Sequence, residues 1–411
     1  MKALVLCGGL PQIELIKNLK ERGIETILAD YNGDCIACVY ADKFYEISVF
    51  DVEEIINISR NENVDFLITV CADQVLQVVA EVSERLNLPC YIDYETSKKV
   101  SSKKLMKKIF WENDIPTTKY VVLSSLSKDE LLNLNYPLIV KPVDSYSSRG
   151  VKRVDTYSEL ERAFNEALEV SKEKQVVVEE FFSGLELSVD VFVENGCTHI
   201  LCVSALYKIP GNNKFVINRL VYPAPVNKGV YLEIEQVVDK IAKSFNLKNT
   251  PMLVQLITDG ENISVVEFCA RTGGGDKFRL IKRVTGFDVI DAVVKLTVGE
   301  KTFVTIQKKE EIVVDEFLYC KEGVLDYIVG QDELIEEKII DEFHCLKIKG
   351  QKFGKISSSS DRVAYFSISG ANMQEVCEKH REINRRLKVM SQNGEDILNH
   401  DILTTFYEVC D

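Results

Sequence analysis

The stretch Met252–Gly275, MLVQLITDGENISVVEFCARTGGG, holds two apolar runs joined by the turn Asp259-Gly260. An Asp-Gly turn between apolar runs is a strong signal for a β-hairpin. Glu267 and Cys269 lie two residues apart in the second run, so both side chains point to one face of the strand. A carboxylate on a covered face is costly unless it meets a cation. The hairpin therefore predicts a polar site on that face, next to the glycine-rich end of the stretch.

Residues 1–95 alternate between strand-like and helix-like segments. Lys2–Cys7 is an apolar strand, Gly8-Gly9 a turn, Pro11–Arg22 has helical periodicity, and Glu25–Ala29 is a second strand. The pattern predicts a parallel sheet with covered faces in a Rossmann-like α/β scaffold. The two glycines lack the GxGxxG spacing of a dinucleotide site, so we favour a plain strand-to-helix turn over a nicotinamide enzyme.

The middle of the chain combines two lysines with a small-residue loop. Lys141 ends the apolar strand Pro137–Pro142, where anions bind in α/β proteins, and Lys103 lies 38 residues before it at the start of a helix. The loop Asp144–Val151 follows at once, and its small residues let backbone N–H groups approach phosphate oxygens. Each feature alone is equally typical of a surface lysine or an ordinary loop.

The pattern of predicted secondary structure changes after residue 300. Residues 303–370 are rich in strand-like runs, and Asn372 with Glu375 forms a capping box that predicts a helix to Leu387. We therefore expect a domain boundary near residue 305. Together with the alternating N-terminal pattern, this predicts an α/β protein that is α+β overall.

The composition is that of an ordinary globular protein, with 46% apolar and 28% charged residues. A length of 411 residues suffices for two or three domains. The net charge of −14 argues against nucleic acid or acidic lipid as a partner. No apolar run approaches the ~18 residues of a membrane span, and the apolar start is too short for a signal peptide. We expect a cytoplasmic protein that binds neither nucleic acid nor membranes.

The twelve cysteines are scattered, often inside strand-like runs, so we interpret most of them as reduced, buried, small side chains. Cys35 and Cys38 have the CxxC spacing of redox or metal pairs. No second CxxC exists to complete a zinc site, so we favour an ordinary structural role. The four histidines form no HExxH spacing, which argues against zinc or histidine-base chemistry.

Taken in order, these features resemble the ATP-grasp superfamily of ADP-forming carboxylate–amine ligases. The resemblance covers about residues 1–305 and extends to biotin carboxylase, D-alanine–D-alanine ligase and the carbamoyl-phosphate synthase large subunit. Residues 310–411 are more similar to the C-terminal domain of ATP-grasp L-amino-acid ligases. The resemblance implies a Rossmann-like domain over 1–95 and an ATP-grasp core with antiparallel sheets over 96–305, which includes a lid at about 118–185. It also implies a smaller α+β closing domain over 306–411.

The resemblance also implies roles for single residues in ATP binding. Lys103 and Lys141 match the lysines that contact the nucleotide, and Glu186 matches the acceptor of the ribose hydroxyls. Glu179 matches the residue that receives the adenine amino group. The other expected nucleotide contacts are the hinge residues Phe181 and Phe182 and the phosphate-loop residues Ser147, Ser148, Arg149 and Gly150.

Gln255 and Glu267, twelve residues apart, match the family's two metal-ligand positions, where hard oxygen ligands suit Mg²⁺ or Mn²⁺. Cys269 stands where relatives carry asparagine, and a thiol is a poor magnesium ligand. Arg271 matches the arginine that steadies the transferred phosphoryl group. Without the ordered series, these glutamates and lysines would be read as solvated or ion-paired surface groups. The same ambiguity holds for three further cations that a substrate carboxylate could meet, namely Lys208, Arg219 and Arg279.

The implied reaction joins a small-molecule carboxylate to an amine. ATP phosphorylates the carboxylate, an amine attacks the acyl phosphate, and ADP and phosphate leave. An amino acid is the leading candidate for one substrate, and a homodimer is a further expectation. Two alternatives stay open: phosphorylation of bicarbonate or carbamate, as in carbamoyl-phosphate synthase, and ATP binding without turnover.

Overall fold

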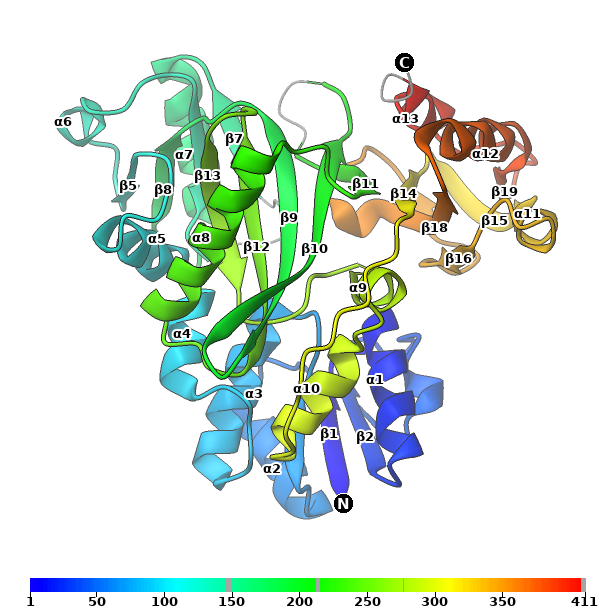
Figure 1. Cartoon of the computed structure of the whole chain (residues 1–411), viewed down its shortest axis with the longest axis horizontal. Helices are drawn as coiled ribbons and strands as arrows, with labels where there is room; N and C mark the ends of the chain where they lie inside the picture. The colour runs from blue at the N-terminus through cyan, green and yellow to red at the C-terminus, as the bar shows by residue number, and fades with distance from the viewer. Residues whose placement is uncertain (145–149, 212–214, 276, 408–411) are drawn as a thin grey trace.

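The computed structural model describes residues 1–144, 150–211, 215–275 and 277–407 (Figure 1). Its N-terminal layer is a four-stranded sheet in the order β3-β2-β1-β4, in which every pairing is parallel. The expected Rossmann-like arrangement is therefore confirmed. The strands are β1 Lys2–Leu6, β2 Glu25–Asp30, β3 Lys43–Glu46 and β4 Phe66–Ile68, and the helices are α1 Leu10–Glu21, α2 Val52–Glu62 and α3 Asp73–Leu86.

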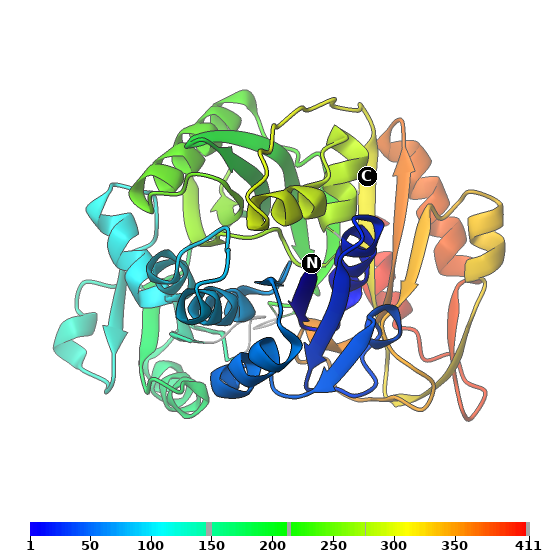
Figure 2. The ribbon, with the colours of Figure 1, turned by 90° about the horizontal axis from the view of Figure 1, so that it is seen from below.

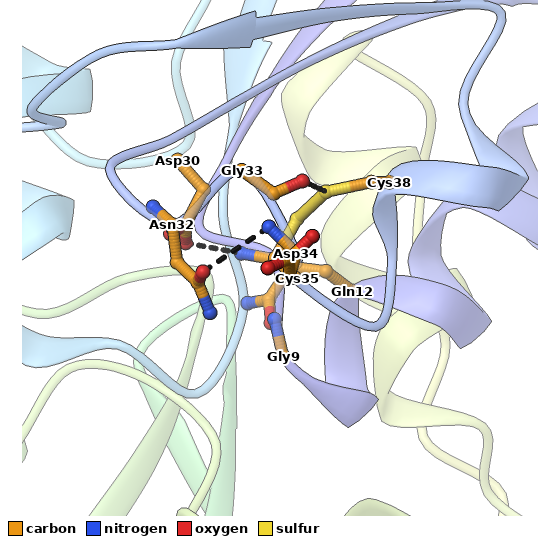
Figure 3. Close-up of a disulfide and its surroundings, with 9 residues drawn as sticks. Gly9, Gln12, Asp30, Asn32, Gly33, Asp34, Cys35 and Cys38 are labelled. Atoms are coloured by element: carbon orange, nitrogen blue, oxygen red, sulfur yellow. Dashed lines mark hydrogen bonds between the residues drawn. A yellow bond between two sulfur atoms is a disulfide. The ribbon is translucent and has the colours of Figure 1, made fainter. Parts of the chain in front are cut away.

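A disulfide joins Cys35 and Cys38 in the segment that follows β2, so these two cysteines are not reduced, unlike most of the cysteines as we interpreted them (Figure 3). The Cys35 sulfur packs on the β1–α1 turn, where a Cβ on Gly8 would overlap it. The Gly8 N–H donates to Asp30 Oδ2 at 2.7 Å, which ties the same turn to the end of β2. Because the disulfide closes a very short loop, the chain-entropy estimate of its stabilisation is only about 2 kcal/mol.

The region expected to form the lid, at about residues 118–185, folds as a four-stranded antiparallel sheet in the order β5-β8-β6-β7, and we use the name lid for this sheet and its helices (Figure 1). Alternate residues of β8 face opposite ways, so Val176 and Val178 pack on the apolar cluster beneath α7, while Glu179 lies on the other face. The lid strands are β5 Tyr120–Leu123, β6 Leu138–Pro142, β7 Lys152–Val154 and β8 Val176–Glu180, and the nearby helices are α4 Tyr94–Ser101, α5 Lys103–Glu112, α6 Lys128–Leu131 and α7 Tyr157–Val170.

The central sheet has eight strands in the order β13-β12-β9-β10-β11-β14-β18-β16, all antiparallel. The predicted Asp-Gly hairpin is present as β12 and β13, and α8 covers one face of the sheet (Figure 1). The strands are β9 Leu185–Glu194, β10 Cys197–Lys208, β11 Ile217–Tyr222, β12 Thr250–Thr258, β13 Ile263–Cys269, β14 Ile312–Tyr319, β16 Glu342–Cys345 and β18 Arg362–Gly370, and the helices are α8 Lys228–Ser244, α9 Lys277–Thr285 and α10 Val289–Thr297.

The C-terminal segment completes the central sheet rather than standing apart from it, because β14 pairs with β11. Viewed from below, the N-terminal layer lies in front of the central strands, and the C-terminal strands extend them to one side (Figure 2). The predicted helix after Asn372 is α12, and the Asn372 side chain accepts from the Glu375 N–H. Three short strands form a separate sheet: β15 Gly323–Val329, β17 Lys352–Phe353 and β19 Lys388–Ser391, accompanied by α11 Gln331–Glu336, α12 Met373–Arg386 and α13 His400–Thr404.

Over the residues that the structure describes, we find no helix with both the length and the apolar character to cross a membrane.

Candidate active site

Two cavities meet between the lid, the central sheet and the N-terminal layer. The inner cavity, of about 150 Å³, lies between the lid and the central sheet, and the outer cavity, of about 550 Å³, is bordered by α3 and the end of β13. Lys103 and Glu267 line both. The inner cavity is lined by Lys103, Lys107, Lys141, Glu179, Phe181, Phe182, Glu186, Lys208, Gln255 and Glu267, and the outer one by Asp73, Lys98, Lys103, Asp144, Glu267, Cys269 and Arg271, among others.

Gln255 and Glu267 are direct cross-strand partners on β12 and β13. The register places their side chains on the face of the hairpin that borders the inner cavity, opposite the face covered by α8. Lys103, the first residue of α5, lies 3.6 Å from Glu267 through its Nζ. An amide oxygen and a carboxylate on adjacent strands are a donor set that fits Mg²⁺, so these two residues suit the metal role that the resemblance implies.

Glu179 binds two lysines at once. Its Oε1 lies 2.5 Å from Lys141 Nζ, and its Oε2 lies 2.7 Å from Lys107 Nζ. The Thr118 hydroxyl also donates to Oε2 at 3.0 Å. Burial tends to raise the pKa of Glu179, but the charges of Lys107 and Lys141 outweigh it and bring the pKa to about 2. Glu179 is thus a fixed anion at the wall of the inner cavity, and both of its oxygens have partners in this structure.

The other predicted nucleotide contacts surround the same space. Glu186, at the start of β9, pairs with Lys208 of β10 at 2.5 Å, and both side chains are partly exposed. Phe181 and Phe182 follow β8 and supply an apolar wall. Several elements together therefore bring a carboxylate, a pair of aromatic rings and several cations to the inner cavity.

Arg271 follows β13 and reaches the N-terminal layer. Its Nε and Nη2 donate to the two carboxylate oxygens of Asp73, the first residue of α3, and its Nη1 donates to Thr272 O at 2.6 Å. Burial would raise the pKa of Asp73, but the charge of Arg271 outweighs it, and the pKa lies below its usual range. The pair fixes the guanidinium beside the outer cavity.

Cys269 lies between these groups. Burial raises the pKa of its thiol well above the usual range, so the side chain is a neutral thiol. A neutral thiol does not ligate magnesium. Cys269 therefore does not replace, as a metal ligand, the asparagine that the family carries at this position.

The glycine loop after β13 lies close to a second buried ion pair. A Cβ on Gly273 would lie 2.8 Å from Lys277 Cγ and 2.9 Å from Asp190 Oδ1. Lys277 in turn lies 3.0 Å from Asp190 Oδ2 and donates to Ser204 at 2.9 Å. The absence of a side chain at Gly273 thus lets the loop pack down on the central sheet.

Three predicted residues of the phosphate loop, Ser147, Ser148 and Arg149, lie outside the described residues. Gly150, which follows them, has a positive φ of 76° and packs near Pro142. The three cations whose role the sequence left open lie in three different surroundings. Lys208 lines the inner cavity, Arg219 is buried against Glu316, and Arg279 pairs with Glu14 and Glu342 near a different cavity.

The sequence interpretation missed Lys107 and Asp73. Lys107 follows Lys103 by four residues, so the two share a face of α5, and that spacing could have indicated it. Asp73 meets Arg271 across a separation of 198 residues, and no local pattern points to this pair.

A family model described as "ATP-grasp domain" matches residues 134–278. The carbamoyl phosphate synthase large chain of Thermotoga maritima is 24% identical over an alignment of 326 residues that covers 77% of this chain and 29% of that protein. The arginine-specific carbamoyl phosphate synthase large chain of Bacillus subtilis is 23% identical over an alignment of 302 residues that covers 69% of this chain and 28% of that protein. The chain thus spans less than a third of the length of these curated relatives.

Solved structures agree with the fold. An L-amino acid ligase from Bacillus licheniformis superposes with a TM-score of 0.79 at 21% identity, over 95% of this chain and 99% of that one. The biotin carboxylase domain of a Hydrogenobacter thermophilus 2-oxoglutarate carboxylase, solved with MgADP, gives 0.78 at 14% identity, over 100% and 98%. The chain carries an ATP-grasp fold, as its sequence predicted.

Proposed function

We propose that the protein is an ADP-forming ligase that phosphorylates a small-molecule carboxylate and couples it to an amine. One observation carries this proposal: the inner cavity, with its cations and its Gln255–Glu267 pair, shares Lys103 and Glu267 of its wall with the outer cavity. Such a junction lets a triphosphate in one cavity present its terminal phosphoryl group to an acid in the other.

In this proposal Lys103 and Lys141 bind the nucleotide phosphates and Glu186 accepts from the ribose hydroxyls. Phe181 and Phe182 enclose the adenine. Glu179 was expected to receive the adenine amino group, but both of its carboxylate oxygens are already bound, so we propose that it holds Lys107 and Lys141 instead. Gln255 and Glu267 would hold Mg²⁺, which neutralises phosphate charge when it is bound. The division of the chain at residues 95 and 305 into scaffold, ATP-grasp core and closing domain is part of the same proposal.

The two chemical steps need positioning more than covalent help from the protein. A carboxylate oxygen forms a bond to the γ-phosphorus while the bond to the β-phosphate bridge breaks, which gives an acyl phosphate and ADP. The amine nitrogen then bonds to the acyl carbon, phosphate departs, and the nitrogen loses a proton to solvent. Arg271, oriented by Asp73, lies where it can stabilise the negative charge on the transferred phosphoryl group.

The outer cavity would take the acid and the amine. Its wall mixes cations, Lys98, Lys103 and Arg271, with the carboxylates of Asp73 and Glu267. Groups of both signs suit a zwitterion, so we favour an amino acid as one substrate. A homodimer is a further proposal, which the molar mass from light scattering would test.

The carbamoyl phosphate synthase relatives make phosphorylation of bicarbonate or carbamate the second candidate. Those proteins are more than three times as long as the part that this chain matches. A screen of ADP release separates the candidates: the purified chain is given ATP, a magnesium titration, and acids and amines singly and in pairs. The ligase predicts ADP release that needs one acid with one amine. Release with bicarbonate alone would favour the second candidate, and binding without any release would indicate a silent nucleotide-binding protein.

A further inference from the structure

Lys107 is a buried lysine that the proposed reaction does not use. Its side chain is only 2% exposed, although it borders the inner cavity. Its Nζ donates to the Thr117 hydroxyl at 2.5 Å, and that hydroxyl donates to Val265 O at 2.9 Å. Lys107 is therefore held from α5 between the lid and the central sheet, with the Glu179 carboxylate as its ionic partner.

The charges around Lys107 do not balance. One carboxylate, Glu179 of β8, serves two ammonium groups, Lys107 and Lys141, so this buried cluster carries a net charge of about +1. Among the described residues, the other charged or titratable groups that face it are Glu267 of β13, Tyr120 of β5, whose ring centre is 5.9 Å from Nζ, and Lys103 on its own helix, which lies against Glu267.

Buried charge of one sign is costly unless a partner arrives to compensate it. Burial lowers the pKa of Lys107 despite the opposing charge of Glu179, which agrees with this imbalance. The proposed function places the nucleotide phosphates in the inner cavity beside the cluster. When nucleotide binds, its phosphates would supply the negative charge that compensates the excess positive charge.

We propose that Lys107 is a positioning residue of the nucleotide site: it holds Glu179 from one side, Glu179 directs Lys141 from the other, and the excess charge attracts the phosphates. The inference rests on the proposed function. It predicts that Lys107 acts through Glu179 on nucleotide affinity, whichever acid and amine the enzyme joins.

The test is calorimetric titration of the full chain with ADP and Mg²⁺, which needs no acid or amine. Lys107→Met should weaken ADP binding about tenfold, because one buried charge that attracts the phosphates is gone. Lys107→Arg, which keeps the charge, should restore most of the affinity. Lys108→Met is the matched control: its side chain is 66% exposed and pairs with Glu112, and ADP affinity should stay within about twofold.

A second readout distinguishes this role from simple packing. ADP phosphates should raise the pKa of Lys107, so titrations in buffers of different ionisation enthalpy, repeated over a series of alkaline pH values, should show proton uptake that is absent in Lys107→Met. Wild-type affinity in a folded Lys107→Met variant would overturn the inference alone. If that variant does not fold, wild-type binding without proton uptake would overturn it. A wild-type chain that binds no ADP would overturn the proposed function and this inference together.

Discussion

Two buried ion clusters in this molecule use the same kinds of groups in opposite ways. Arg219 of β11 donates through Nε and Nη2 to both oxygens of Glu316 on β14, and the two side chains are 1% and 0% exposed. The guanidinium also lies 4.6 Å from the centre of the Phe406 ring. Arg219 and Glu316 balance each other in charge and are closed off by packing, with the buried His380 ring beside them, its Nε2 3.5 Å from Glu316 Oε2. The Lys107–Glu179–Lys141 cluster has one charge too many and borders a cavity.

The comparison separates structural burial of charge from functional burial. A balanced, bidentate pair that borders no cavity offers no site for a ligand, so we expect its removal to lower the free energy of unfolding. An unbalanced cluster at a cavity wall keeps a net charge in low dielectric, and we expect its loss to be felt in ligand affinity. The variants below test whether that separation holds.

The largest expected effect is on the closed pair. Arg219→Met leaves Glu316 buried without its cation, which should lower the free energy of unfolding by about 3–5 kcal/mol. Urea denaturation measures this, with Arg385→Met, 72% exposed on α12, as the control that should change it by less than about 1 kcal/mol. An Arg219→Met variant that stays stable yet loses nucleotide binding would contradict the assignment of this pair to structure.

Acid should weaken the Lys107–Glu179–Lys141 cluster, because low pH protonates Glu179. Its folded pKa of about 2 lies below the ordinary value of 4.5, so its stabilisation is present above pH 4.5 and is lost as the pH falls toward 2. The full contribution is about 3 kcal/mol. Unfolding free energies measured from pH 5 to 3 should fall less steeply in Glu179→Gln than in wild type, while the exposed control Glu95→Gln should follow wild type. Equal slopes for all three proteins would show that the lysines do not hold this carboxylate.

Metal dependence should distinguish Glu267 from its neighbours on the same hairpin. Glu267→Gln should reduce kcat by about 100-fold, because one of the two proposed magnesium ligands loses its charge. Glu261→Gln, in the exposed turn of the hairpin, is the matched control and should retain full turnover. Undiminished turnover in Glu267→Gln at low magnesium would remove Glu267 from the metal site.

The smallest effect should come from Lys208, whose pair with Glu186 lies between the two extremes. The two side chains are 28% and 15% exposed, so water screens them and Lys208→Met should cost less than about 1 kcal/mol of stability. Nucleotide affinity should change by no more than about threefold. A loss comparable with that of Arg219→Met would show that partial exposure does not weaken such pairs here.

Local sequence patterns predicted much of the fold. Alternating apolar segments gave the parallel N-terminal layer, and Asp259-Gly260 gave the hairpin that carries Gln255 and Glu267. Helix α9 was not predicted, because four basic residues in nine obscure its apolar face. The pairing of β14 with β11 was not predicted either, because strand pairing across about ninety residues has no local signature.

The site was predictable where strand period places side chains, and not where distant groups meet. Lys141, Glu179 and Glu267 each lie on a strand face that the alternation of apolar residues defines. The contacts that set their chemistry are long-range: Lys107 with Glu179, and Asp73 with Arg271. A single sequence shows charge and spacing, but not which opposite charges fold together.

The most direct test of the central claim is to trap the acyl phosphate. Hydroxylamine attacks acyl phosphates, so the chain is incubated with ATP, Mg²⁺ and single carboxylic acids, and hydroxamate and ADP are both measured. The account predicts that at least one acid, with amino acids tested first, gives hydroxamate and ADP in equal amounts, and that Lys141→Met abolishes both. ATP binding with neither hydroxamate nor ADP across a broad panel of acids would contradict it.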